Sequence, residues 1–331
     1  MQRPRASGRF GAAATAVPFP LSPFPFPLSP AAFDPMSPTP TPTFPSHAPT
    51  RRALHWATVA MLGTAAVLAG CSTLDEKQRA WIFQPTDRSW GGGYQAEGMN
   101  EVWIDFMSLE TGAPARLNGL WLAQDKPDAP VLLYLHGARW DVRSSAQRMR
   151  RMHELGFAVL GIDYRGFGRS SAALPSETLA HEDALAAWRW LAERHPSTKR
   201  YLFGHSLGGA IAVRLAGEVD DAAGLMVEGS FTSIADVVQS TRWGWLPLSP
   251  LITQRFDAVS HIERVKAPLL VVHGSEDRLI QPTLGRALFE RARSPKRFVL
   301  VDGGTHHNTN AVGQEAYRQA IAELFGWRSV N

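Results

Sequence analysis

Short apolar runs alternate with longer amphipathic segments along most of this chain, from Val102 to Phe325. The run at residues 131–135 (Val-Leu-Leu-Tyr-Leu) is apolar throughout, as expected of a strand that is buried on both faces. The segment 176–194 places apolar side chains at helical spacing behind Ser176, a residue suited to an N-cap. Repeated alternation of this kind predicts a mainly parallel, twisted sheet with helices on both faces.

The same pattern gives an ordered series of elements. Strands are expected at residues 102–108, 119–123, 131–135, 157–162, 200–203, 223–227, 269–272 and 298–301. Helices are expected at residues 143–155, 176–194, 207–216, 283–292 and 315–325. Between Ser230 and Lys266 there is room only for a short cap, in which Trp243, Trp245 and Phe256 either line an acyl pocket or pack the cap itself.

A serine flanked by glycines follows the expected strand at 200–203. Gly204-His205-Ser206-Leu207-Gly208 matches the G-x-S-x-G nucleophile elbow, in which a sharp turn between a strand and a helix projects the serine hydroxyl. Glycines on either side allow that turn and let the helix pack closely. The strand before the motif and the apolar helix after it supply the context that the motif requires, so Ser206 is the predicted nucleophile.

A second motif, His136-Gly137, ends the expected strand at 131–135. With these two motifs the chain resembles the α/β-hydrolase family, in which a histidine and a glycine at this strand end open the oxyanion loop. The resemblance implies the α/β-hydrolase fold. It also implies that the backbone N–H groups of Ala138 and Leu207 point at the developing oxyanion, where donors fixed in advance stabilise the transition state.

Two further loops extend the resemblance over about residues 102–326. The sequence at 163–170 (Asp-Tyr-Arg-Gly-Phe-Gly-Arg-Ser) resembles the family's D-x-R-G-x-G-x-S loop. The sequence at 228–233 (Glu-Gly-Ser-Phe-Thr-Ser) resembles a turn found in a branch with acyl-protein thioesterase-like and peptidase-like members. In the family, Asp163 would support its loop and would not react with substrate.

The acid and the base of a triad should follow the serine in the order acid, then histidine. Asp277, in His273-Gly274-Ser275-Glu276-Asp277, stands where the family's acid sits, and Glu276 is expected to be a solvated loop residue. Glu228 remains the alternative acid, since some relatives take the acid from the end of the preceding strand.

Two neighbouring histidines, His306 and His307, follow the last expected strand. The G-T-H-x-x-T spacing of this branch puts the base on His306, with His307 lining the pocket, although a shift by one position would exchange them. Neighbouring histidines rarely face one metal ion, and a third ligand at a recognised spacing is missing.

These roles define a mechanism. Ser206 would attack an acyl carbonyl while His306 takes its proton and Asp277 orients the imidazole, and water would then release the acyl group. Neither a metal nor an organic cofactor is required. The expected substrate is an acyl ester or thioester, either a small molecule or a lipid. A peptidase or amidase of the same fold is the alternative reaction, and a catalytically inactive binding lipoprotein is the alternative class.

The start of the catalytic part is preceded by an export signal. Arg51-Arg52 stand before a mostly apolar run, and Leu68-Ala69-Gly70-Cys71 resembles the bacterial lipobox. Cys71 is the only cysteine, so the chain cannot form an internal disulfide, and lipidation of Cys71 is predicted. The alternatives are an uncleaved transmembrane anchor, for which residues 53–74 are long enough, and ordinary cleaved export.

The predicted organisation has four parts. Residues 1–50, with 13 of the 24 prolines, form a disordered extension; residues 51–70 are the signal, 71–100 a linker and 101–331 the catalytic domain. The first 70 residues hold five Arg and one Asp, so of 34 basic and 30 acidic residues the remainder carries 29 of each. This balance does not predict a nucleic-acid partner. The lipid implies an exported protein on the periplasmic side of a membrane, with Ser72 after the cysteine suggesting the outer membrane.

Overall fold

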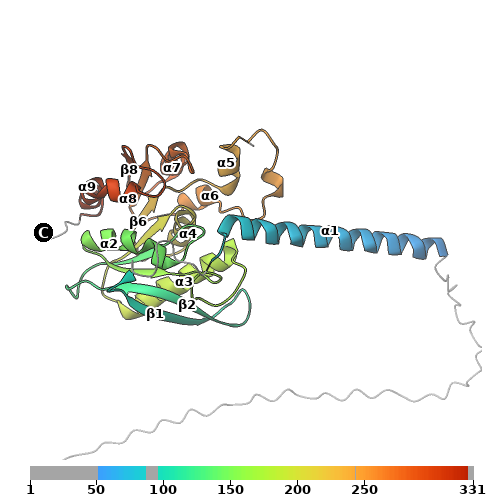
Figure 1. The fold of residues 1–331 in the computed structure, drawn as a ribbon, viewed down its shortest axis with the longest axis horizontal. Helices are drawn as coiled ribbons and strands as arrows, with labels where there is room; N and C mark the ends of the chain where they lie inside the picture. The colour runs from blue at the N-terminus through green and yellow to red at the C-terminus, as the bar shows by residue number, and fades with distance from the viewer. Residues whose placement is uncertain (1–50, 87–95, 243, 327–331) are drawn as a thin grey trace, which may run out of the picture. The chain divides into compact units, whose positions relative to one another are not determined.

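The computed structural model describes residues 51–86, 96–242 and 244–326 of the chain. It divides the chain into two units, residues 1–56 and residues 57–331. The second unit carries the sheet with its covering helices (Figure 1). The predicted disordered extension at 1–50 and the glycine run at 91–93 lie outside the described residues.

An eight-stranded sheet forms the centre of the second unit, in the order β1-β2-β4-β3-β5-β6-β7-β8. Strands β1 and β2 pair antiparallel, β2 also pairs antiparallel with β4, and the remaining pairs are parallel. The sheet therefore confirms the predicted, mainly parallel arrangement. The strands are β1 (Asn100–Met107), β2 (Pro114–Leu122), β3 (Val131–Leu135), β4 (Ala158–Ile162), β5 (Arg200–His205), β6 (Ala222–Glu228), β7 (Leu269–Gly274) and β8 (Lys296–Val301).

Helices cover both faces of this sheet (Figure 1). One apolar core joins it to α3 (Glu177–Arg194), α4 (Leu207–Ala216), α6 (Ala258–Ile262) and α7 (Pro282–Arg291). The other core joins it to α2 (Ala146–Glu154) and α9 (Gln314–Phe325). Smaller elements are α5 (Ile234–Gln239), α8 (Thr309–Val312) and the 3-10 turns at Val142–Ser145 and Ser249–Leu251. Ser176 caps α3 as predicted, since its hydroxyl accepts the N–H of Leu179 at 3.1 Å.

The parallel strands bring their carboxyl ends to one edge of the sheet. Leu135 of β3 pairs with Gly204 of β5, and His205 pairs with Glu228 of β6. The residues that follow these strands therefore start from neighbouring positions at that edge, where ligands bind in open α/β sheets.

A long helix, α1 (Arg51–Phe83), stands where the sequence predicted a signal followed by a linker at 71–100. The linker expectation is corrected as far as Phe83, because this end of the helix packs into the core with Ile82 and Phe83 buried. Sequence reasoning missed the buried end of the helix because, after the apolar run of the signal, residues 72–83 hold too few apolar side chains to show a helical period. Among the described residues, no helix is both long enough and apolar enough to cross a membrane.

The cap between β6 and β7 consists of α5, a 3-10 turn and α6. Phe256 lies in the core with 3% of its surface exposed, whereas Trp245 is 77% exposed. Of the two expectations for the cap, the structure therefore assigns packing to Phe256. Trp243 lies outside the described residues.

Candidate active site

Ser206 occupies a strained turn between β5 and α4. Its φ of 54° and ψ of −121° place a non-glycine residue in a region of backbone space that is costly for a side chain with a Cβ atom. The turn is held by the N–H of Ser206, which donates to the Glu228 carbonyl at 2.9 Å, and by the Ser230 hydroxyl, which donates to the Ser206 carbonyl. The side chain of Ser206 is partly exposed, so its hydroxyl is accessible.

The glycines of the motif are required by close packing. A Cβ atom on Gly204 would lie 2.3 Å from the carbonyl oxygen of Gly208, and one on Gly208 would lie 2.2 Å from the carbonyl oxygen of Leu135. Both distances are far shorter than a non-bonded contact between a carbon and an oxygen atom, so larger residues would force the helix away from the strands. The sequence had predicted this role for the glycines.

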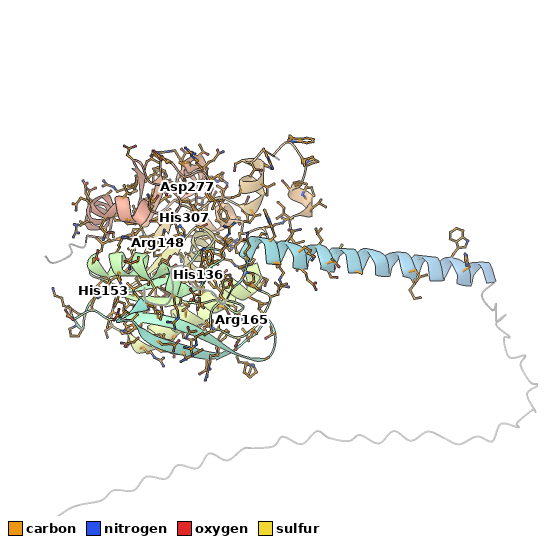
Figure 2. All side chains as sticks on the ribbon, viewed as in Figure 1. His136, Arg148, His153, Arg165, Asp277 and His307 are labelled. Carbon is orange, nitrogen blue, oxygen red and sulfur yellow. The ribbon has the colours of Figure 1, made fainter. Side chains whose placement is uncertain are left out.

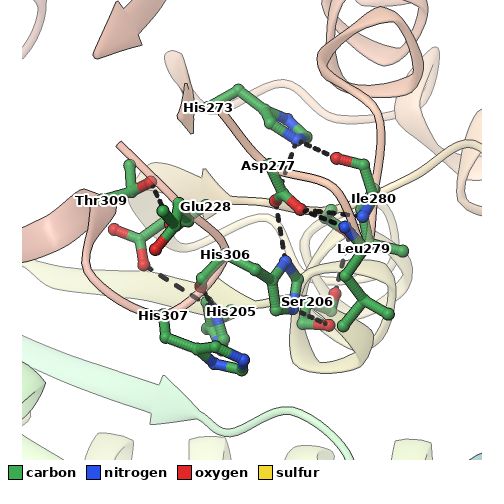
Figure 3. A network of polar contacts seen from close by, with 12 residues as sticks. His205, Ser206, Glu228, His273, Asp277, Leu279, Ile280, His306, His307 and Thr309 are labelled. Atoms are coloured by element: carbon green, nitrogen blue, oxygen red, sulfur yellow. Dashed lines mark hydrogen bonds and ion pairs between the residues drawn. The ribbon is translucent and has the colours of Figure 1, made fainter. Parts of the chain in front are cut away.

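His306 connects the serine to Asp277 (Figure 3). Its Nε2 lies 3.0 Å from Ser206 Oγ, and its Nδ1 lies 2.8 Å from Asp277 Oδ2. A carboxylate can only accept a hydrogen bond, so Nδ1 carries the proton of the neutral ring. Nε2 is then left as an acceptor for the Ser206 hydroxyl, which is the tautomer that a general base needs.

Asp277 is buried in a cluster of donors at the start of the loop after β7. Its Oδ1 accepts the N–H groups of Leu279 at 3.0 Å and Ile280 at 2.8 Å, and its Oδ2 lies 3.3 Å from Nε2 of His273. Burial acts to raise the pKa of Asp277, but hydrogen bonds from His273, His306 and Ile280 outweigh it and hold the pKa below its ordinary value. Asp277 is therefore a stable carboxylate beside the imidazole.

The other candidates from the sequence lie differently. His307 is exposed, and Glu276 is exposed as predicted. Glu228 is buried, and it pairs with Arg148 at 2.8 Å between Oε1 and Nε and accepts a hydrogen bond from the Tyr317 hydroxyl. The structure thus brings Ser206, His306 and Asp277 together and engages Glu228 elsewhere.

Two residues that sequence reasoning had not singled out support the loop that carries the histidines. His205 donates from Nε2 to the His306 carbonyl at 3.0 Å, and burial lowers the pKa of His205, which keeps its ring neutral. Arg148 donates from Nη2 to the His307 carbonyl at 3.2 Å. Figure 2 labels both residues. The position of His205, directly before the serine at a buried strand end, was a usable signal. Arg148 gave none, since it lies in an ordinary helix of basic residues.

The loop after β3 lies directly against the serine. A Cβ atom on Gly137 would be 3.2 Å from Cβ of Ser206, so only a glycine fits without displacement. The Tyr164 hydroxyl donates to the His136 carbonyl at 3.1 Å and fixes the entry to this loop. On the other side of the serine, Leu207 begins α4. Ala138 directly follows Gly137, which lies against Ser206, and Leu207 directly follows Ser206 itself. Both residues predicted to supply oxyanion donors therefore start from positions beside the serine.

Asp163 begins the loop at residues 163–170, and the rest of the loop folds over its side chain. Its Oδ1 accepts the N–H of Val142 at 2.6 Å, and burial raises its pKa to about 7. A Cβ atom on Gly168 would lie 2.0 Å from Asp163 Oδ2, so the loop folds tightly over this carboxyl group. These contacts are those of a residue that supports its loop. Within the described residues, no group of three or more His, Cys, Asp or Glu side chains is arranged to hold a metal ion.

The mainly parallel sheet, its covering helices and the serine at the strand-to-helix turn define an α/β hydrolase. The chain belongs to the family described as "Serine aminopeptidase, S33", whose model matches residues 125–256 and 251–310. It is therefore a hydrolase of the α/β fold.

Individual relatives agree with this assignment. The chain is 35% identical over 217 residues to an uncharacterised protein of Mycobacterium tuberculosis, covering 64% of this chain and 76% of that one. It is 28% identical over 240 residues to a lysophosphatidylserine lipase of Danio rerio, covering 61% of this chain and 62% of the lipase. An esterase of Pyrococcus furiosus shares the fold with a TM-score of 0.58 at 18% identity, covering 74% of this chain and 98% of the esterase.

Proposed function

We propose that this protein is a serine hydrolase that cleaves acyl esters or thioesters through an acyl-enzyme on Ser206. One observation carries the proposal: Ser206 Oγ, the two ring nitrogens of His306 and Asp277 Oδ2 form an unbroken hydrogen-bonded series at 3.0 and 2.8 Å. These are the groups and the order that activate a serine for attack on a carbonyl.

The mechanism proceeds in two stages. Ser206 Oγ attacks the acyl carbonyl, its proton passes to His306 Nε2, and Asp277 stabilises the imidazolium that results. His306 then gives the proton to the leaving group, and the same residues activate a water molecule that releases the acyl group. The backbone N–H groups of Ala138 and Leu207 receive the negative charge of the tetrahedral intermediate, a contribution of roughly 3–4 kcal/mol for each donor in serine hydrolases.

The substrate class rests on the relatives and on one contact. The Danio rerio relative is a lysophosphatidylserine lipase, which favours an ester bond in a lipid or a similar small molecule. The family description names an aminopeptidase, so a peptidase or amidase is the second candidate. A carboxylate is a suitable partner for the free amine of an aminopeptidase substrate. Glu228, a carboxylate labelled in Figure 3, is already paired with Arg148 and bonded by Tyr317, so it is not free for that role.

A lipid tether on Cys71 would hold this enzyme at a membrane on the exported side, with the outer membrane as the proposed destination. Cys71 is exposed on α1, which gives a modifying enzyme access to it. It precedes Phe83, the last residue of the helix, by twelve residues or about 18 Å of helix. A lipid attached there would keep the carboxyl edge of the sheet close to lipid substrates.

The test combines labelling with turnover. The full chain is treated with a fluorophosphonate probe and assayed on matched ester, thioester and amide substrates of increasing acyl length, with Ser206→Ala as the control. We expect labelling to be lost in the variant and kcat to fall by about 10⁴ or more. Labelling that survives the substitution would move the nucleophile elsewhere, and turnover of the amide alone would establish the peptidase.

A further inference from the structure

Phe83, the last residue of α1, joins three segments that are far apart in the sequence. Its ring is fully buried. It lies 6.3 Å from the ring of Phe167 in the loop after β4 and 5.5 Å from the ring of Phe256 in the cap, measured between ring centres. Aromatic pairs at these separations fix one another's positions in a packed core. Phe83 is thereby held by the cap on one side and by the loop after β4 on the other.

The backbone of Phe83 reaches the loop after β3. Its carbonyl oxygen accepts the N–H of Arg139 at 2.8 Å. Arg139 has a φ of 84°, in the left-handed region that residues with a Cβ atom seldom occupy. Such a conformation persists only where the surroundings hold it in place. The hydrogen bond to Phe83 is a backbone contact that helps to hold it.

Unusual backbone conformations gather at this junction. In the described part of the chain, the non-glycine residues with positive φ are Gln84, Arg139, Ser206 and Phe256. Gln84 follows Phe83, Arg139 is bonded to it, and Phe256 packs on its ring. Strained backbone concentrates where a functional geometry has to be maintained. Ser206 is the elbow itself, so all these positions lie in the site or at its junction with α1.

Arg139 directly follows Ala138, the proposed oxyanion donor. The N–H of Arg139 belongs to the peptide group that begins at Ala138, so its bond to Phe83 fixes the direction in which the chain leaves Ala138. The Tyr164 hydroxyl fixes the chain on the other side of the loop through the His136 carbonyl. An oxyanion donor acts only if it is held in place before the charge develops.

The end of α1 is itself fastened. Arg79 donates to the carbonyl oxygens of Pro175 and Leu174, in the loop after β4. Asp75 accepts a hydrogen bond from Gln254 of the cap at 2.8 Å. The helix therefore cannot shift without breaking contacts to both segments that hold the ring of Phe83.

We propose that Phe83 is a positioning residue for the oxyanion loop: its ring, wedged between Phe167 and Phe256, holds its carbonyl oxygen against Arg139. This bond fixes the peptide group that follows Ala138 and so limits how the residue carrying the proposed oxyanion N–H can turn. This role rests on the proposed function. Phe83 acts through Arg139 on a loop whose proposed donor meets negative charge only when the tetrahedral intermediate forms, so its effect belongs to the transition state. Loss of the ring lowers kcat, leaves KM nearly unchanged and weakens inhibitors that mimic the tetrahedral intermediate.

The experiment compares Phe83→Ala with Phe157→Ala in the full chain. Phe157 is also fully buried, but it belongs to the core on the other face of the sheet, where its ring contacts Tyr201 at 5.2 Å. Both substitutions remove a buried ring and lower the melting temperature. We expect only Phe83→Ala to reduce kcat, by about 10- to 100-fold with KM within about threefold, and to weaken a boronic acid inhibitor by the same factor as kcat.

The kinetics of the two variants either support or overturn the positioning role of Phe83. Equal losses of kcat in the two variants, or an unchanged kcat in Phe83→Ala, would overturn the positioning role. Should Phe83→Ala fail to fold, Phe83→Leu keeps an apolar side chain of similar length. Phe83→Leu should then also lower kcat without a change in KM, by a smaller factor than expected for Phe83→Ala. A normal kcat in Phe83→Leu would reject the proposal. If the Ser206→Ala variant turns over substrate as fast as the wild type, the proposed function itself is rejected.

Discussion

His306 and Asp277, 29 residues apart in the chain, meet at 2.8 Å between Nδ1 and Oδ2, and the other carboxylate oxygen accepts two backbone N–H groups. The loop after β7 and the loop after β8 thus fix one imidazole orientation between them. Since β7 and β8 are parallel neighbours in the sheet, their following loops start from the same edge.

His306→Ala should be as damaging as Ser206→Ala, because residues that act as one unit lose most of their effect together. We expect kcat to fall by about 10⁴. His307→Ala is the matched neighbour, exposed and bonded to Arg148 only through its backbone, and its kcat should fall by less than about tenfold. Steady-state kinetics on one ester substrate checks both. The reverse order of severity would move the base to His307.

Asp277→Asn should lower kcat by about 10⁴, because the amide no longer selects the tautomer with its proton on Nδ1. It should also change the response of stability to pH. Hydrogen bonds hold the pKa of Asp277 below its ordinary value in spite of burial, so its stabilisation is complete above the unfolded pKa of about 3.9 and is lost as pH falls through the folded pKa.

We expect Asp277→Asn to have a lower melting temperature than the wild type near pH 7. Between about pH 4 and pH 2, the melting temperature of the variant should fall less than that of the wild type. Thermal unfolding followed by circular dichroism over this range measures it. Parallel curves for the variant and the wild type would mean that Asp277 has similar pKa values in the folded and unfolded protein.

Glu228→Gln separates the two acids that the sequence left open. The substitution leaves Arg148 without its charged partner inside the protein, which should cost about 3 kcal/mol or more in the free energy of unfolding. Because Asp277 still orients His306, fluorophosphonate labelling of Ser206 should persist at a temperature where the variant is folded. Labelling and chemical denaturation are measured side by side with Asp277→Asn. A loss of labelling as complete as in Asp277→Asn would return the acid role to Glu228.

Cys71→Ala should prevent lipid attachment and lipoprotein processing while leaving the purified enzyme active on a soluble ester. Two or more acyl chains give stable membrane attachment, whereas one does not. Mass spectrometry of the purified N-terminus and membrane fractionation measure the effect, with Ser72→Ala as the adjacent control that keeps the cysteine. A wild-type protein that lacks lipid and retains residues 53–70 would point to an uncleaved anchor.

Much of the fold followed from local pattern. The runs that became β3 and α4 were predicted at the bounds that the structure has, because an all-apolar strand and a glycine-bounded helix leave clear signals over few residues. Element ends were less accurate: β8 begins at Lys296, two residues before its prediction, since the charged start of an outer strand has no apolar signature.

The sequence by itself determined the residue types of the candidate site and their order, because a serine elbow, an acid and a histidine each follow a recognisable strand. Only the tertiary structure decided which neighbours serve them: Glu228 faces Arg148, while Asp277 faces His306. It also turned the end of α1 from an expected linker into part of the core, with Phe83 against Arg139, 56 positions later. Such contacts depend on how distant segments pack, and packing selects partners by shape and burial, which leave no local pattern in the chain.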